Sequence, residues 1–342
     1  MRQKDFLYNS SLAVIIPIYN GEKYIGEMLD SIVKQTFQDW NLWVVDDEST
    51  DSTFSILLDY AKKDTRIKPV KRNRDPKGAQ TCRNLGFELS EGAKYVIFFD
   101  ADDTIAPYCF EQRVSYMESH PNLDFAVFPA KAFRTDPYDN SNRYFGVIKQ
   151  KDDYLNFLYP WLSFVVWCNI YRRDSLVSHE MRWDERVLIN QDSDYNIQAM
   201  HRGMKYDYCD DARVDYYYRT MVEGSVSKKK KQRSRFDSFL YLLDKYNSTF
   251  TIEEKKKYKN AITHRLLYFA LDFSQDKDRF KTLLNHPFFG ASWWVKCRLK
   301  LIAPYLKHGR LLDIFFPQVR NRYKSFVDTY TKESVSIAQT KI

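Results

Sequence analysis

Short apolar runs alternate with helical patterns along the first hundred residues of the chain. The apolar runs lie at residues 12–17, 42–45, 67–70 and 95–99. Short continuous runs of this kind are typical of strands that are buried on both faces of a sheet. Between the first two runs, apolar side chains recur at helical spacing over residues 25–33. This alternation predicts an α/β fold with a doubly wound parallel sheet that has helices on both faces.

Beyond residue 103 the patterns are less regular. Strand-like runs follow at residues 125–128, 164–171 and 213–218, and a helical run lies at 192–200. From residue 228 onward helical patterns predominate. We therefore predict two domains, an α/β domain at residues 1–227 and a mainly helical extension at residues 228–342.

Polar side chains stand directly after three of the four predicted strands. They are Asn20, then Asp46 and Asp47, and finally Asp100, Asp102 and Asp103. In doubly wound sheets, ligands bind beyond the carboxyl ends of the strands, so these clusters predict a binding site at that edge. The chain has neither a Gly-x-Gly-x-x-Gly motif nor a Walker-type loop, which argues against a dinucleotide-binding enzyme and a P-loop enzyme.

Asp100 and Asp102 flank one small residue at the predicted end of a strand. Two carboxylates at that spacing can both face a pocket, and oxygen ligands suit Mg²⁺ or Mn²⁺. A metal held there would neutralise charge on a departing nucleotide diphosphate. The same spacing also arises by chance and in turns, so the position after a buried strand is what favours a metal site.

Several other polar residues allow two interpretations. Asp192 and Asp194 favour the dipole at the start of a predicted helix, or one of them removes a proton from an acceptor hydroxyl. Asp46 and Asp47 either form a turn and cap a helix, or one of them accepts a hydrogen bond from a base or a ribose. Arg83 either pairs with a phosphate or is an ordinary surface arginine.

Charge is unevenly distributed along the chain. Residues 228–342 contain 25 Lys and Arg against 10 Asp and Glu, whereas the rest of the chain contains 28 against 35. In residues 288–310 aromatic and basic side chains interleave, which favours contact with an anionic membrane surface. The alternatives for this basic extension are a solvated helical face, a helical lid and a dimer contact.

The expected location is cytoplasmic, either free or peripheral on the inner face of the cell membrane. The five cysteines form no Cys-x-x-Cys pair and their number is odd, which favours a reducing compartment over a zinc site or a disulfide framework. The N-terminus shows no signal peptide pattern. The most apolar stretch, residues 157–171, is too short to span a membrane.

Six segments resemble, in the correct order, motifs of the family 2 glycosyltransferases of the GT-A fold. They lie at residues 14–21, 31–36, 45–51, 78–86, 99–103 and 191–192. Each segment alone is weakly specific, whereas six in order are highly specific. The resemblance covers residues 10–227 and implies a mixed, mostly parallel sheet flanked by helices. The C-terminal helical extension matches no family motif and is predicted from its helical patterns alone.

The resemblance implies inverting transfer of a sugar from a UDP-sugar to a hydroxyl acceptor. A glycan or a lipid-linked acceptor is expected, and a lipid-linked acceptor would explain the basic charge of the extension. The expected setting is capsule, lipopolysaccharide or other surface-polysaccharide assembly. Asp192 is implied to be the catalytic base, Asp102 with Asp100 to hold Mn²⁺ or Mg²⁺, and Asp103 to assist at the donor sugar. The residues implied to contact the nucleotide are Pro17, Tyr19, Asn20, Asp47, Arg83, Asp100 and Arg219.

Within the nucleotide site the resemblance assigns Asp47 to the uracil and Arg83 to the base or the diphosphate. Arg219 is assigned to the diphosphate, together with a covering segment at residues 224–227. This chain departs from the family pattern at the catalytic-base motif, where Gln191 stands in place of the usual Glu. No His occupies an obvious metal-ligand position near residue 225, so the metal would rely on Asp102, the diphosphate and water.

Two rival functions remain to be weighed. A sugar nucleotidyltransferase needs a glycine-rich basic loop after the first strand, but residues 18–22 are Ile-Tyr-Asn-Gly-Glu. A non-catalytic protein that binds a nucleotide-sugar, a glycan or a nucleic acid is favoured by the basic extension. It is opposed by Asp100, Asp102 and Asp192, because binding alone requires no base. No nucleic-acid partner is expected.

Overall fold

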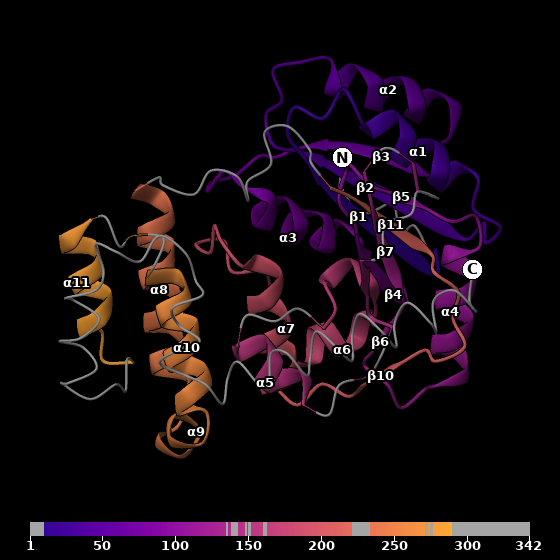
Figure 1. Ribbon diagram of the computed structural model, residues 1–342. Helices are drawn as coiled ribbons and strands as arrows, with labels where there is room; N and C mark the ends of the chain where they lie inside the picture. The colour runs from indigo at the N-terminus through magenta and orange to yellow at the C-terminus, as the bar shows by residue number, and fades with distance from the viewer. Residues whose placement is uncertain are drawn as a thin grey trace.

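The computed structural model describes residues 10–134, 136–137, 143–147, 149, 152–159, 163–220, 233–270, 273 and 276–288. Figure 1 shows a central sheet with helices around it and a further group of helices, α8 to α11, to one side. The predicted boundary between residues 227 and 228, and almost all of the aromatic and basic stretch at 288–310, lie outside the described residues. Both stay predictions.

The main sheet has seven strands in the order β10-β6-β9-β4-β1-β2-β3. They are β1 (Leu12–Ile18), β2 (Trp40–Asp46), β3 (Ile67–Lys71), β4 (Tyr95–Phe98), β6 (Phe125–Val127), β9 (Asn169–Arg172) and β10 (Tyr206–Tyr208). The first four strands pair in parallel, β10 is parallel to β6, and β9 runs antiparallel to both β4 and β6. The predicted mixed, mostly parallel sheet is confirmed.

A second sheet of four short strands has the order β5-β11-β7-β8. Its strands are β5 (Thr104–Ile105), β7 (Ala130–Phe133), β8 (Tyr144–Phe145) and β11 (Tyr216–Arg219). Because β5 directly follows Asp103 and pairs with β11, this sheet carries Arg219 to the carboxylates after β4.

Helices α1 to α7 connect and flank the strands, and α8 to α11 form the further group (Figure 1). They are α1 (Ile25–Val33), α2 (Thr53–Lys63), α3 (Ala79–Leu89), α4 (Cys109–Ser119), α5 (Asp153–Leu158), α6 (Arg173–Ser178), α7 (Gln191–His201), α8 (Arg233–Thr249), α9 (Ile252–Lys257), α10 (Lys259–Ala270) and α11 (Lys277–Asn285). No helix in the described part of the chain is long and apolar enough to span a membrane.

The strand predicted over residues 164–171 is partly wrong. A 3₁₀ turn, Val166–Cys168, occupies its centre, and only its end enters β9. The fully buried Arg113 donates hydrogen bonds to the carbonyl oxygens of Trp167, at 3.0 Å, and of Asn169, at 3.4 Å. A periodicity argument does not reveal contacts of this kind, because they join residues that are far apart in the sequence.

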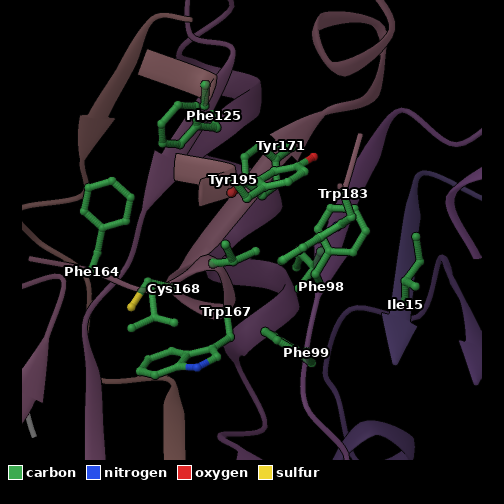
Figure 2. Packing of buried hydrophobic residues seen from close by; sticks show 14 of the residues in the cluster. Ile15, Phe98, Phe99, Phe125, Phe164, Trp167, Cys168, Tyr171, Trp183 and Tyr195 are labelled. Atoms are coloured by element: carbon green, nitrogen blue, oxygen red, sulfur yellow. The ribbon is translucent and has the colours of Figure 1, made fainter. Parts of the chain in front are cut away.

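Helix α3 lies against β1 at very short range. A Cβ atom added at Gly86 would lie 2.5 Å from Cγ2 of Ile15, closer than real Cβ contacts allow. Arg83, one turn earlier on the same helix, has its guanidinium carbon 4.3 Å from the ring centroid of Trp183. Figure 2 shows Trp183 among the buried aromatic side chains, where it stacks on Tyr195 with a centroid separation of 4.4 Å. The core thus supports the helix that presents Arg83.

Candidate active site at the carboxyl edge of the sheet

The turn after β1 is fastened to the turn after β2 through Asn20. The backbone N–H of Asn20 donates to Ser49 Oγ at 2.9 Å, and its side-chain oxygen accepts from the backbone N–H of Thr50 at 2.8 Å. Pro17 is buried within β1, whereas the Tyr19 ring is 50% exposed and carries Lys77 Nζ 3.9 Å from its centroid. Asn20 therefore connects two turns at the carboxyl edge of the sheet, and Tyr19 is a half-exposed aromatic side chain at the same edge.

Asp47 lies at the end of β2 in a buried ion pair that the sequence reasoning missed. Its Oδ1 is 2.6 Å from Nε of Arg72 and accepts from the Gly78 N–H at 3.3 Å. Arg72 also pairs with Oε2 of Glu48 at 2.6 Å. The only sequence indication was the position of Arg72, immediately after the neighbouring strand β3. Arg72 thus holds the Asp47 carboxylate, which the resemblance assigns to the uracil, in place.

Arg83 joins two predicted motifs that are far apart in the sequence. Its Nη2 lies 2.7 Å from Oδ1 of Asp100, and its Nη1 donates to Oε1 of Gln191 at 3.1 Å. The side chain of Arg83 is only 8% exposed, whereas that of Asp100 is 30% exposed. Gln191 thus accepts from Arg83 through its neutral side-chain carbonyl, whereas a Glu at this position would accept through a charged carboxylate.

Asp102 lies beside Asp100 with its carboxyl group largely enclosed. Burial, followed by the Asp100 charge, raises the pKa of Asp102 to about 6, against the opposing charge of Arg219. In the described part of the chain no three His, Cys, Asp or Glu side chains gather to hold a metal by themselves. Mg²⁺ and Mn²⁺ suit a site of one or two carboxylates completed by ligand oxygens and water, so this mutually repelling pair fits such an ion.

Asp103 is fully buried and holds β11 in place. Its Oδ1 accepts from the Arg219 N–H at 2.6 Å, and its Oδ2 accepts from the Tyr216 hydroxyl at 2.5 Å. Burial and the nearby Asp102 and Asp100 raise the pKa of Asp103 well above its usual range. In this structure Asp103 positions Arg219, and a contact with the donor sugar stays a prediction.

Arg219 points its guanidinium toward the same edge. Nε donates to the Asp102 carbonyl oxygen at 2.9 Å, and Nη2 lies 2.5 Å from Oε2 of Glu27, which is itself more than half exposed. Glu27 belongs to the first turn of α1 and was not foreseen as a site residue. The covering segment predicted at 224–227 lies outside the described residues.

Asp192 and Asp194 occupy the first turn of α7, and the structure distinguishes them. Asp194 is 2% exposed and its Oδ2 is 2.7 Å from Nζ of Lys245, so its charge is already paired. Burial raises the pKa of Asp192 to about 6, with Arg83 opposing the rise and Asp100 adding to it. A carboxyl group with this pKa is mostly ionised near neutral pH and can accept a proton.

Residues 13–179 match the family model described as glycosyl transferase family 2. This part of the chain belongs to that family. Among curated relatives, the minor teichoic acid biosynthesis protein GgaB of Bacillus subtilis is 29% identical over 234 residues, a match that covers 66% of this chain and 24% of GgaB.

Solved structures agree on the GT-A fold. Staphylococcus aureus TarS 1-349 in complex with UDP-GlcNAc is 20% identical with a TM-score of 0.63, covering 92% of each chain. The mannosyltransferase PcManGT of Pyrobaculum calidifontis, in complex with GDP-Man and Mn²⁺, is 17% identical with a TM-score of 0.53. That match covers 98% of this chain and 87% of PcManGT.

The family 2 match includes the turns after β1, β2 and β4 and the helix that bears Arg83. It ends before Asp192 and Arg219. The fold brings both to the same edge, because Arg83 contacts Gln191, the neighbour of Asp192, and Arg219 contacts the Asp102 carbonyl oxygen. The roles of these two residues therefore depend on the geometry of this chain.

Proposed function

We propose that this family 2 glycosyltransferase is an inverting, metal-dependent enzyme that uses a UDP-sugar as its donor. The observation that carries the proposal is the position of Arg83, which contacts Asp100 at 2.7 Å and Gln191 at 3.1 Å. Through these two contacts Arg83 connects the carboxylates proposed to hold a metal with Gln191, the neighbour of the carboxylate proposed to act as the base.

In the proposed reaction Asp192 accepts the proton of the acceptor hydroxyl as its oxygen attacks the anomeric carbon of the donor. The bond to the nucleotide diphosphate breaks on the opposite side of that carbon, which inverts its configuration. Asp100 and Asp102 would hold Mn²⁺ or Mg²⁺, which neutralises charge on the departing diphosphate. Arg219, held by Asp103, would pair with a phosphate.

The donor and acceptor are proposed from the similar proteins. TarS is seen with UDP-GlcNAc, and PcManGT with GDP-Man and Mn²⁺, so the donor panel must include both nucleotides. The name of GgaB points to a surface polymer, and we propose a growing or lipid-linked surface polysaccharide as the acceptor. Attachment to an anionic membrane through the basic extension remains part of this proposal, and failure to sediment with anionic liposomes at low salt would contradict it.

The test is release of free nucleotide from a panel of UDP- and GDP-sugars with Mn²⁺, with and without EDTA. We expect EDTA-sensitive UDP release from one donor. Asp102→Asn should abolish that release, while Asp59→Asn, which changes an exposed carboxylate paired with Lys62, should retain it. EDTA-insensitive release would contradict the metal role, and absence of UDP binding with Mn²⁺ would contradict the donor assignment.

Inversion needs its own measurement. The anomeric configuration of the product can be read from the NMR coupling constant of its anomeric proton. It should be opposite to that of the donor. Retention of configuration would contradict the role proposed for Asp192.

A further inference from the structure

Helix α8 makes several polar contacts with the stretch of residues 183–190, which precedes α7. Its Ser238 Oγ accepts from the Leu188 N–H at 2.7 Å, and its Tyr241 hydroxyl donates to Oδ2 of Asp184 at 2.7 Å. The guanidinium of Arg186 lies 3.9 Å from the Tyr241 ring centroid. This stretch leads directly into α7, whose first turn carries Asp192. Figure 1 shows α8 on the side of α3 and α7 that faces away from the main sheet.

Lys245 of α8 forms ion pairs with two carboxylates. Its Nζ lies 2.7 Å from Oδ2 of Asp194 and 3.0 Å from Oδ2 of Asp184. The Lys245 side chain is 17% exposed, and that of Asp194 is 2% exposed. One ammonium group thus connects the beginning of the stretch to the first turn of α7. Removal of one partner from a buried ion pair strongly destabilises the protein, because the other charge is left buried and unpaired.

The opposite side of the same stretch is held by α3. Asn84 accepts from the Trp183 N–H at 3.0 Å and donates to the Trp183 carbonyl at 2.9 Å. Its side chain also donates to Oε1 of Glu185 at 2.9 Å, and Gln80 donates to the carbonyl oxygen of Val187. The stretch is therefore held between α3, which bears Arg83, and α8, which bears Lys245.

The end of this stretch sets the direction of α7. Asn190, immediately before the helix, has φ 55°, in the left-handed region. Asn adopts this region more readily than other non-glycine residues, so Asn190 suits the turn that leads into α7. Gln191 and Asp192 follow at once, so the position of the stretch decides how they meet Arg83 and Asp100.

We propose that Lys245 is a positioning residue for sugar transfer, and that α8 belongs to the working catalytic unit although it lies beyond the family-matched residues. By fixing Asp184 and Asp194, Lys245 holds the turn that presents Asp192 to the reaction. The inference rests on the proposed function for the role of Asp192, but the position of the turn can be measured without it.

The kinetic test uses three variants of the full chain. Lys245→Met removes the charge, Lys245→Arg preserves it, and Lys256→Met is a control at an exposed lysine of α9. We expect Lys245→Met to lower kcat by about 10- to 100-fold, as misplacement of a reacting group by about 1 Å does, with KM for the donor little changed. Lys245→Arg should restore most of kcat, and Lys256→Met should behave as wild type.

A fourth variant separates positioning from stability. Lys245→Met combined with Asp194→Asn removes the unpaired buried charge, so its free energy of unfolding should recover relative to Lys245→Met alone. We expect kcat to stay low in this double variant, because the connection between Asp184 and α7 is still missing. Recovery of kcat together with stability would overturn the proposal and leave Lys245 a structural role only.

Amide hydrogen exchange provides a readout that needs no donor. In the double variant the amides of residues 188–195 should exchange faster than in wild type, with the strands of the main sheet unchanged. Unchanged exchange at 188–195 would overturn the proposal even in an active enzyme. Faster exchange in a protein that releases nucleotide from no donor would instead count against the proposed function and not against the positioning of the turn by Lys245.

Discussion

Replacing Arg83 with Met should shift the pH dependence of the reaction in a predictable direction. Arg83 supplies the positive charge that opposes the burial of Asp192 in setting its pKa at about 6, and the neighbouring Asp100 charge already raises it. Arg83→Met removes that opposing charge and also leaves Asp100 without its ion pair at 2.7 Å. Both changes disfavour ionised Asp192, so its pKa must rise.

The size of the shift follows from ordinary electrostatics. An opposite charge near a carboxyl group lowers its pKa by about 1–3 units. Arg83 is paired directly with Asp100, so we take the lower limit, about one unit or ~1.4 kcal/mol. The ionised fraction of Asp192 at pH 6 then falls from about one half to about one tenth, while well above neutral pH it hardly changes.

The assay is kcat/KM for UDP release between about pH 5 and 8, where the acidic limb reports the free enzyme. For wild type, a base that must be ionised loses activity as pH falls through about 6. For Arg83→Met the limb should lie about one unit higher, and Arg83→Lys, which keeps the charge, should lie between the two. An acidic limb that does not move in Arg83→Met would refute the assignment of this limb to Asp192.

Two predictions concern the stability of the fold: the buried pair of Arg113 with Asp215, and the packing of α3 on β1. Arg113→Met should destabilise the protein by about 3–5 kcal/mol in urea unfolding, because it leaves the buried Asp215 carboxylate without its partner at 2.7 Å; a loss well below this range would show that the pair is not isolated from water. Gly86→Ala should cost about 1–3 kcal/mol because its Cβ would meet Ile15 at 2.5 Å. Gly26→Ala, in an open helical position, is the matched control and should not destabilise, so equal losses at both positions would contradict the close packing of α3 on β1.

The sequence predicts what depends on local periodicity. Buried runs identify β1 to β4, and because parallel strands end at one edge, their order alone places Asn20, Asp47 and the Asp100–Asp103 cluster together. That part of the prediction needs only the alternation of strands and helices. It is confirmed for the fold, while the chemical roles of these residues stay predictions.

The sequence does not predict partners that only the tertiary fold brings together. Arg72 pairs with Asp47, Glu27 with Arg219 and Lys245 with Asp194, and none of these pairs follows from spacing along the chain. The difference between Asp192 and Asp194 likewise depends on α8, whose Lys245 pairs with Asp194 alone of the two. Ion pairs of this kind depend on distance and burial, which no one-dimensional pattern contains.

The most direct measurement for the proposed reaction is the single-turnover rate of sugar transfer or donor hydrolysis by Asp192→Asn, with UDP and Mn²⁺ binding measured on the same protein. If Asp192 is the base, the rate should fall by about 10²- to 10⁴-fold. Affinity for UDP with Mn²⁺ should stay close to that of wild type, because Asn keeps the shape of the side chain. A rate near that of wild type would contradict the proposal and assign proton removal to another group.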